Sequence, residues 1–199
     1  MRWDHLFDDL ESQLEHELGA EEVDLFAEEE RLRLGRLALR DRFRAMMPSS
    51  GAATPLRVLL TDGMRLSIAV GAVGRDWIAG ELSSESGSAA SCIVPVGSIA
   101  ACFPDAGQTA ASTDADEMAG SRVGSLAARL GLGFVLRDLC RRRAPLQITT
   151  AREQLHGTID RVARDHVDLA EHDQGVARRD RSVRTLRMLP MTEIVLIRF

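Results

Sequence analysis

Residue types that support binding or catalysis gather in two short triplets, each at a point where the chain is expected to bend. Arg75-Asp76-Trp77 follows Val73-Gly74, and Arg164-Asp165-His166 follows Val162-Ala163. A carboxylate beside a cationic side chain suits a small ligand or a peptide, with the Trp77 ring as an apolar anchor. An aspartate in a turn more commonly accepts hydrogen bonds from its own backbone. We therefore expect a structural role first, and we keep a binding role as the alternative for Arg75, Asp76, Trp77, Arg164, Asp165 and His166.

No residues with catalytic spacing accompany these triplets. The chain has no Gly-x-Ser-x-Gly nucleophile elbow and no Gly-x-x-x-x-Gly-Lys phosphate loop, and it contains no lysine that could form a Schiff base. A metal site needs several converging ligands, whereas His166 and Asp168 share a strand face and His172 lies beyond that strand. We predict a protein without catalytic residues, metal or cofactor, and no small-molecule substrate is evident.

Cysteine content and hydropathy bear on the compartment. The three cysteines, Cys92, Cys102 and Cys140, are an odd number without metal-ligand spacing, which favours reduced, buried thiols. No run approaches the ~18 consecutive apolar residues of a membrane-spanning helix, and no secretory leader opens the sequence. These observations predict a cytoplasmic protein without a membrane span.

Arginine supplies every basic side chain other than histidine. Because arginine codons are GC-rich and lysine codons AT-rich, this composition predicts a bacterial genome of the high-GC, actinobacterial kind. The net charge is -5, and residues 1–30 hold twelve Asp or Glu against one Arg, which argues against a dedicated nucleic-acid protein. The arginines that an RNA-binding alternative would use are Arg141, Arg142, Arg143, Arg178 and Arg179.

Alternating apolar residues separated by turn residues predict short strands in two groups of five. Thr61-Asp62-Gly63 is expected to turn the chain between the first two strands, because glycine adopts a positive φ without strain. The predicted strands span residues 56–60, 64–73, 77–81, 92–96 and 98–103, and then 146–150, 155–162, 166–171, 183–189 and 192–198.

Apolar residues spaced by three and four predict helices in front of each group of strands. Residues 2–18 and 21–47 form a predicted helical arm, with Phe26, Leu34 and Phe43 among its expected buried positions. A second helical segment, residues 123–143, is expected to kink near Gly131 or Gly133. The intervening residues 105–124 are predicted to be a flexible acidic linker, because they lack a periodic apolar pattern.

The two groups of strands repeat one another in sequence. Each begins on a helix that carries Leu-Arg-Asp, and each opens its first strand with Pro-Leu. Each has the sequence Val-x-Arg-Asp at its bend and ends in Pro-x-x-x-Ile. The paired segments are Leu39–Asp41 with Leu136–Asp138, Pro55-Leu56 with Pro145-Leu146, and Pro95–Ile99 with Pro190–Ile194.

A helix followed by five short strands in this order resembles the Sm-like proteins (Sm, LSm and Hfq), which are small SH3-like barrels. Gly157-Thr158-Ile159 and Asp165–Leu169 are similar to that family's curved second strand, tight turn and third strand. The resemblance implies an α+β fold in which an N-terminal helical arm is followed by two tandem Sm-like five-stranded β-barrels, each preceded by a helix. Its expected parts are the arm (1–47), the first barrel with its helix (37–104), the linker (105–124) and the second barrel with its helix (125–199).

The RNA-binding residues of that family do not carry over. Its Asp-x-x-x-Asn element has no counterpart after Asp76 or Asp165, since the chain contains no asparagine, and Val96-Gly97 and Met191-Thr192 replace its Arg-Gly pair. The resemblance still implies exposed edge strands, which join subunits by strand pairing in that family. We therefore predict a non-catalytic interaction or regulatory protein that binds protein partners or associates with itself, with a dimer expected. RNA binding is the alternative.

Overall fold

The computed structural model describes residues 25–47, 54–83, 90–113, 126–176 and 178–199. The chain divides into two compact units, Met1–Ala38 and Leu39–Phe199. In the first unit the described helix covers residues 25–36, where Arg33 pairs with Glu30 at 2.6 Å. The helix predicted over residues 2–18 lies outside the described residues.

The predicted helix over residues 21–47 is interrupted. Residues 37–38 are not helical, and α2 (Leu39–Ala45) follows them. Phe43 on α2 is buried as expected, with 1% of its surface exposed, but Phe26 and Leu34 are 71% and 42% exposed. Apolar spacing correctly predicts helix here, yet it does not say whether another element covers the apolar residues, and the expected burial of Phe26 and Leu34 was wrong.

Ten strands in the second unit form one open sheet, in the order β5-β1-β2-β3-β4-β10-β6-β7-β8-β9. Every pair of neighbouring strands is antiparallel. Each strand lies within a few residues of a strand predicted from the sequence. The strands are β1 (Leu56–Leu60), β2 (Arg65–Val73), β3 (Trp77–Leu82), β4 (Ala90–Pro95), β5 (Ile99–Phe103), β6 (Pro145–Thr149), β7 (Gln154–Val162), β8 (His166–Glu171), β9 (Thr185–Pro190) and β10 (Leu196–Arg198).

The prediction of two closed five-stranded barrels was wrong. Strand β4 pairs with β10, so the two groups of strands join edge to edge in a single sheet whose free edges are β5 and β9. The junction places Ile93 opposite Ile197. These side chains are only 1% and 0% exposed, and burying them stabilises the joined sheet.

The sequence repeat is visible in the backbone. We call residues 39–113 the first half and residues 126–199 the second half. The strand order β5-β1-β2-β3-β4 of the first half matches β10-β6-β7-β8-β9 of the second. Each half also carries a bulge at the equivalent place, between Val70 and Ala72 in β2 and between Ile159 and Arg161 in β7. A bulge bends its strand and redirects the extra residue, so both halves curve at the same point.

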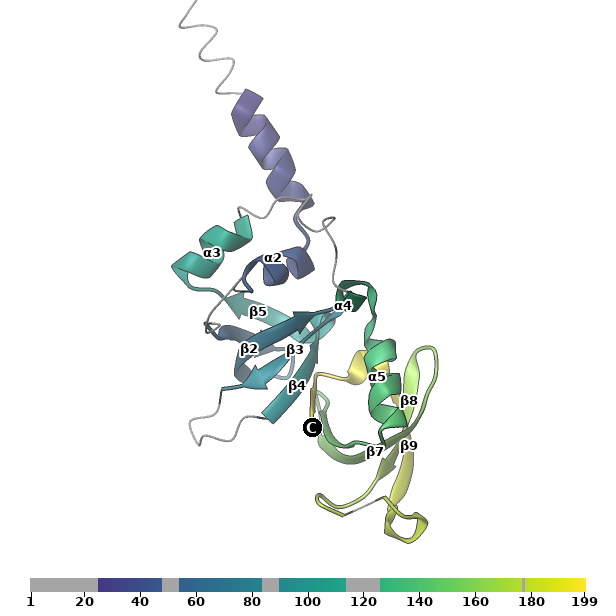
Figure 1. Ribbon diagram of the computed structural model, residues 1–199. Helices are drawn as coiled ribbons and strands as arrows, with labels where there is room; N and C mark the ends of the chain where they lie inside the picture. Colours follow the sequence, from purple (N-terminus) through teal and green to yellow (C-terminus); the bar gives the residue numbers. More distant parts are fainter. Residues whose placement is uncertain (1–24, 48–53, 84–89, 114–125, 177) are drawn as a thin grey trace, which may run out of the picture. The chain divides into compact units, whose positions relative to one another are not determined.

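The helical segment at the start of the second half is broken near Gly131, as expected. It comprises α4 (Leu126–Arg129) and α5 (Leu132–Arg141), and Gly131 is the N-cap residue of α5. Helix α5 packs against β7 (Figure 1). Short 3-10 turns follow β4, precede β9 and follow β9, namely η1 (Val96–Ser98), η2 (Asp180–Ser182) and η3 (Met191–Glu193). No helix within the described residues is long and apolar enough to cross a membrane.

The first part of the predicted linker is helical. Helix α3 (Ala106–Thr113) begins with a reciprocal capping box, in which the Gln108 amide donates to Asp105 Oδ1 at 2.8 Å and the Asp105 amide donates to Gln108 Oε1 at 3.0 Å. Arg42 Nη2 on α2 donates to Ser112 Oγ at 2.9 Å. The polar side chains of this stretch therefore cap α3 and contact α2. Residues 114–124 of the predicted linker lie outside the described part of the chain.

Two apolar cores each draw on both halves. The first contains Trp77 and Ile93 of the first half among residues of the second, and the second contains Val195 and Leu196 of the second half among residues of the first. Neither core is complete without side chains from the other half. The largest fully buried side chains are Phe43, Leu60, Ile68, Ile78, Ile93, Leu136, Ile148, Ile159, Leu169, Ile194, Leu196 and Ile197.

The cysteines lie in or beside these cores as free thiols. Cys92 is 1% exposed, and burial raises its pKa to about 11. Burial also raises the pKa of the partly exposed Cys102. Both thiols are protonated near neutral pH and are poor nucleophiles.

Candidate functional site

The first predicted triplet, Arg75-Asp76-Trp77, contacts the chain where α4 ends and α5 begins. The Trp77 indole Nε1 and the Arg75 amide both donate to the Leu130 carbonyl oxygen, each at 3.0 Å. Trp77 is only 5% exposed. The aromatic side chain that looked like a ligand anchor is therefore engaged by the second half of the same chain.

Asp76 holds the beginning of α5. Its Oδ1 accepts a hydrogen bond from the Leu132 amide at 2.7 Å, which satisfies one of the free N–H groups of the first helical turn. The N-cap residue Gly131 has no side chain for this task, and a Cβ atom there would lie 2.4 Å from Arg75 Nη2. A carboxylate from the first half thus caps a helix of the second half, and its negative charge suits the helix dipole.

The second triplet, Arg164-Asp165-His166, has the same backbone and different surroundings. The Ala163 amide donates to the His166 carbonyl at 2.9 Å and the Met191 amide to the Asp165 carbonyl at 2.8 Å, as the Gly74 and Val96 amides do at the first bend. The Asp165 side chain is 82% exposed and lies 2.8 Å from His166 Nδ1. This hydrogen bond lowers the pKa of Asp165. Within the described ranges, no residue outside the triplet donates to its carboxylate.

The two triplets therefore share a turn but not a role within the chain. The structure does not bring the six residues together into one site. A ligand at the second bend stays a prediction from sequence. Within the described ranges, no group of three or more His, Cys, Asp and Glu side chains is arranged to hold a metal ion.

Two of the arginines predicted for RNA binding close the end of α5. Arg141 Nη2 and Arg142 Nε each lie 2.7 Å from an oxygen of Asp138. Hydrogen bonding from Arg141, together with the nearby charge of both arginines, lowers the pKa of Asp138. These exposed pairs sit at the negative end of the helix dipole, where cations are favourable. Their arrangement supports a capping role, and an RNA contact stays a prediction.

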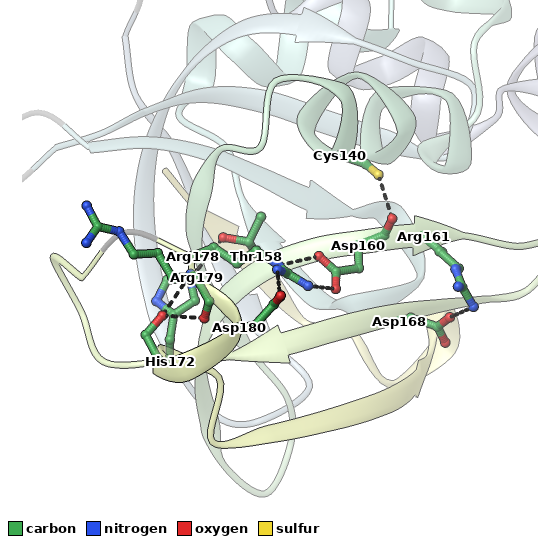
Figure 2. A network of polar contacts seen from close by, with 10 residues as sticks. Cys140, Thr158, Asp160, Arg161, Asp168, His172, Arg178, Arg179 and Asp180 are labelled. Atoms are coloured by element: carbon green, nitrogen blue, oxygen red, sulfur yellow. Dashed lines mark hydrogen bonds and ion pairs between the residues drawn. The ribbon is translucent and has the colours of Figure 1, made fainter.

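Arg178 fastens the loop after β8 to the bulge of β7. Figure 2 shows its guanidinium between Asp160, the extra residue of the bulge, and Asp180. Arg178 donates to both oxygens of Asp160, at 2.9 and 2.6 Å, and to Asp180 at 2.8 Å. These bonds raise the pKa of Arg178 above its ordinary value. Arg179 is exposed, and its backbone amide donates to the Oγ of Ser182, the last residue of η2.

The free edge of β9 exposes two large apolar side chains. Leu186 and Met188 are 69% and 76% exposed. Met188 stands 95 residues after Ile93, and Pro190, which ends β9, stands 95 residues after Pro95, which ends β4. The repeat thus makes Met188 the counterpart of a residue that β10 buries. We call Leu186 and Met188 the β9 edge surface.

Arg143 and Arg178 also line a cavity of about 810 Å3 in the second half, which they share with Arg198, His156 and His172. The sequence interpretation missed the last three residues as site candidates. Period-two alternation places His156 and Thr158 on one strand face, so the sequence could have grouped these two residues. Arg198 joins them because β10 pairs with β6, and local sequence does not specify this long-range pairing.

No protein-family model, curated protein or solved structure matches this chain. The resemblance to Sm-like proteins accordingly stays a prediction from short motifs.

Proposed function

We propose that this chain is a non-catalytic interaction protein that binds protein partners through the free edges of its sheet, beginning with a second copy of itself. One observation carries this proposal. The pairing of β4 with β10 inside the chain joins the fourth strand of one repeat to the fifth strand of the other. Strands β9 and β5 are the fourth and fifth strands at the two ends of the sheet, and among the described residues no strand pairs with their outer edges.

The free edge of β9 corresponds by the repeat to the edge of β4, and the free edge of β5 corresponds to the edge of β10. Strands β4 and β10 pair with each other inside the chain. An edge strand presents unpaired N–H and C=O groups that can pair with another strand. Ile93 and Ile197 pair inside the chain. By the repeat, Ile93 corresponds to Met188, 95 residues later, and Ile197 corresponds to Cys102, 95 residues earlier. The equivalent pairing between copies therefore sets Met188 of one copy opposite Cys102 of the next. The Cys92–Arg198 pair corresponds in the same way to Arg187 opposite Phe103. The exposed β9 edge surface supports this assignment, because burial of Met188 would remove a 76% exposed apolar side chain from water.

Such an interface joins two different surfaces, so it is heterologous. Heterologous contacts close into rings or continue as open assemblies, depending on the rotation between copies. The resemblance to Sm-like proteins, whose edge strands join subunits, agrees with this proposal. RNA binding receives less support, because Arg141, Arg142 and Arg178 are ion-paired within the chain.

A cysteine at position 188 tests the proposed register. Directly opposed residues on antiparallel strands have Cβ atoms ~4.5–5.5 Å apart, close to the distance that a disulfide spans. We expect Met188→Cys to form a disulfide with the native Cys102 of another copy on mild oxidation, giving covalent multimers on non-reducing gels. Adding Cys102→Ser should abolish these multimers.

Leu186→Cys is the matched control, since its counterpart position by the repeat is Pro104 and no thiol faces it. Multi-angle light scattering of the native chain should show concentration-dependent association that Met188→Glu weakens. Leu32→Glu, at a 53% exposed site on the helix of residues 25–36, should leave association unchanged if the sheet edges drive it. A native chain that stays monomeric at high concentration, with no Cys102-dependent cross-link, would refute the proposal.

A further inference from the structure

A cationic cavity in the second half lies beside strands β10, β6 and β7 and the loop that follows β8. Its volume is about 810 Å3, within the range of small-molecule sites. Among the described residues that line it, three are arginines, two are histidines and none is Asp or Glu. The cavity is therefore electropositive and suits an anion.

The polar side of the cavity follows from strand register. Arg198 of β10 stands opposite Gln147 of β6, and Gln147 stands opposite His156 of β7. Opposed residues in adjacent strands point to the same face of a sheet, so the three side chains form one row. Gln147 Nε2 also donates to Gln154 Oε1 at 2.7 Å, which orients its amide.

A buried hydrogen-bonded pair forms another part of the lining. His172 and Thr158 are 4% and 1% exposed, and His172 Nε2 lies 2.9 Å from Thr158 Oγ1. His172 Nδ1 lies 3.0 Å from the Asp173 carbonyl oxygen. Because a carbonyl only accepts, Nδ1 carries a hydrogen and donates it. Figure 2 shows this pair beside the loop that Arg178 fastens to Asp160, so this wall of the cavity is held in place.

Two arginines in the lining have no carboxylate partner among the described residues, namely Arg143 and Arg198. The Nε atom of Arg198 is buried and has no hydrogen-bond partner within the described ranges, and its Nη2 donates to the weak acceptor Met64 Sδ at 3.6 Å. By contrast, Arg178 in the same lining is satisfied by Asp160 and Asp180. Arg198 is half-buried and Arg143 is exposed. A buried N–H group without an acceptor is costly, and an oxyanion is the natural partner of a guanidinium.

Arg143 follows the end of α5 in a left-handed backbone conformation. Its φ is 49°, in the left-handed region that follows many helices and favours glycine there. The Arg143 amide donates to the Cys140 carbonyl at 3.0 Å, and the Ala144 amide to the Leu139 carbonyl at 3.1 Å, as expected at a helix end. An arginine in this position is strained relative to glycine, and Arg143 is one of the residues that line the cavity.

We propose that this cavity binds a small organic anion, with a phosphate or carboxylate group held by Arg198 and Arg143. The apolar body of the ligand would lie against Pro145, Val176 and Phe199, which line the same cavity. Phosphate esters and carboxylates both present the anionic oxygens that a guanidinium group binds. Phenyl phosphate and benzoate distinguish the two classes of ligand. This site is distinct from the sheet edges proposed for association.

Titration calorimetry of the full chain tests the proposal with phenyl phosphate, benzoate, inorganic phosphate and the neutral benzyl alcohol. At least one of the two aromatic anions should bind saturably at one site per chain. Benzyl alcohol should not bind, and inorganic phosphate should bind more weakly than phenyl phosphate if the apolar wall contributes. Phenyl phosphate binding alone identifies a phosphate site, and benzoate binding alone identifies a carboxylate site.

Variants then locate the bound anion. Arg198→Met should weaken binding by at least about tenfold, since a charged hydrogen bond is lost. Arg143→Gly should also weaken binding while the melting temperature stays unchanged or rises, which separates loss of the ligand contact from loss of folding. Arg152→Gln removes an exposed charge of the second half and should leave binding unchanged. No saturable binding of either aromatic anion at millimolar concentration, or equal binding by Arg198→Met and the native chain, would overturn the proposal.

Discussion

The same residue type performs different tasks in the two copies of the bend. Asp76 and Asp165 occupy equivalent positions and accept the same backbone hydrogen bond through their carbonyl oxygens. Only the Asp76 carboxylate meets a helix N-terminus, at Leu132. The sequence indicated a turn at both places, but the helix that reaches the first bend comes from more than 50 residues later in the chain. No local pattern could have distinguished the two carboxylates.

The two aspartates provide a matched pair of mutations. Asp76→Ala leaves the Leu132 amide without its acceptor, and we expect it to lower the free energy of unfolding by ~1 kcal/mol, as for other lost helix caps. Asp165→Ala removes a carboxylate that is 82% exposed, and its effect should fall within ~0.5 kcal/mol. Urea denaturation followed by circular dichroism measures both. Equal losses in the two variants would contradict the capping role of Asp76.

At the scale of elements, local chemistry determined the strands and long-range pairing determined the sheet. Alternation and turns such as Thr61-Asp62-Gly63 place every strand close to its predicted position, and Gly63 has the expected positive φ of 87°. The junction between β4 and β10 joins residues about a hundred positions apart, and no periodicity in either strand specifies its partner. Helix α3 was missed because its signal is the capping pair Asp105 and Gln108 rather than an apolar stripe.

Strands β7 and β8 approach each other closely at Gly157. A Cβ atom at Gly157 in β7 would lie 2.4 Å from the Ala170 carbonyl oxygen of β8. We therefore expect Gly157→Ala to lower the free energy of unfolding by ~1–3 kcal/mol, because the strands must separate to admit the methyl group. Gly97→Ala is the control, since a Cβ atom there meets nothing within 4 Å. Thermal unfolding of both variants checks this, and a stable Gly157→Ala chain would show that the strands adjust without cost.

At the scale of the whole molecule, the two halves form one cooperative structure. Each apolar core contains side chains from both halves, and Leu196 and Ile197 of β10 enter different cores. The predicted division into two barrels would allow each half to unfold independently. The shared cores instead favour a single transition.

Unfolding monitored by two probes tests this cooperativity. In a Trp3→Phe background, tryptophan fluorescence reports on Trp77 at the junction, while circular dichroism reports on all the strands. We expect coincident urea transitions for the two probes. Ile197→Ala should shift both transitions together, by ~2–5 kcal/mol in the free energy of unfolding. Separate transitions, or a shift of one probe alone, would show that the halves are independent.

The position of β10 in the chain affects how the protein is made. Strand β4 ends at Pro95 and its partner β10 begins at Leu196, and at ~5–20 residues per second a ribosome needs roughly 5–20 s to cover these ~100 residues. During that interval the nascent first half displays an unpaired β4 edge and an unfilled core, the features that recruit chaperones or cause aggregation. Synonymous codon changes that slow translation between residues 96 and 195 would prolong this exposure without altering the finished protein.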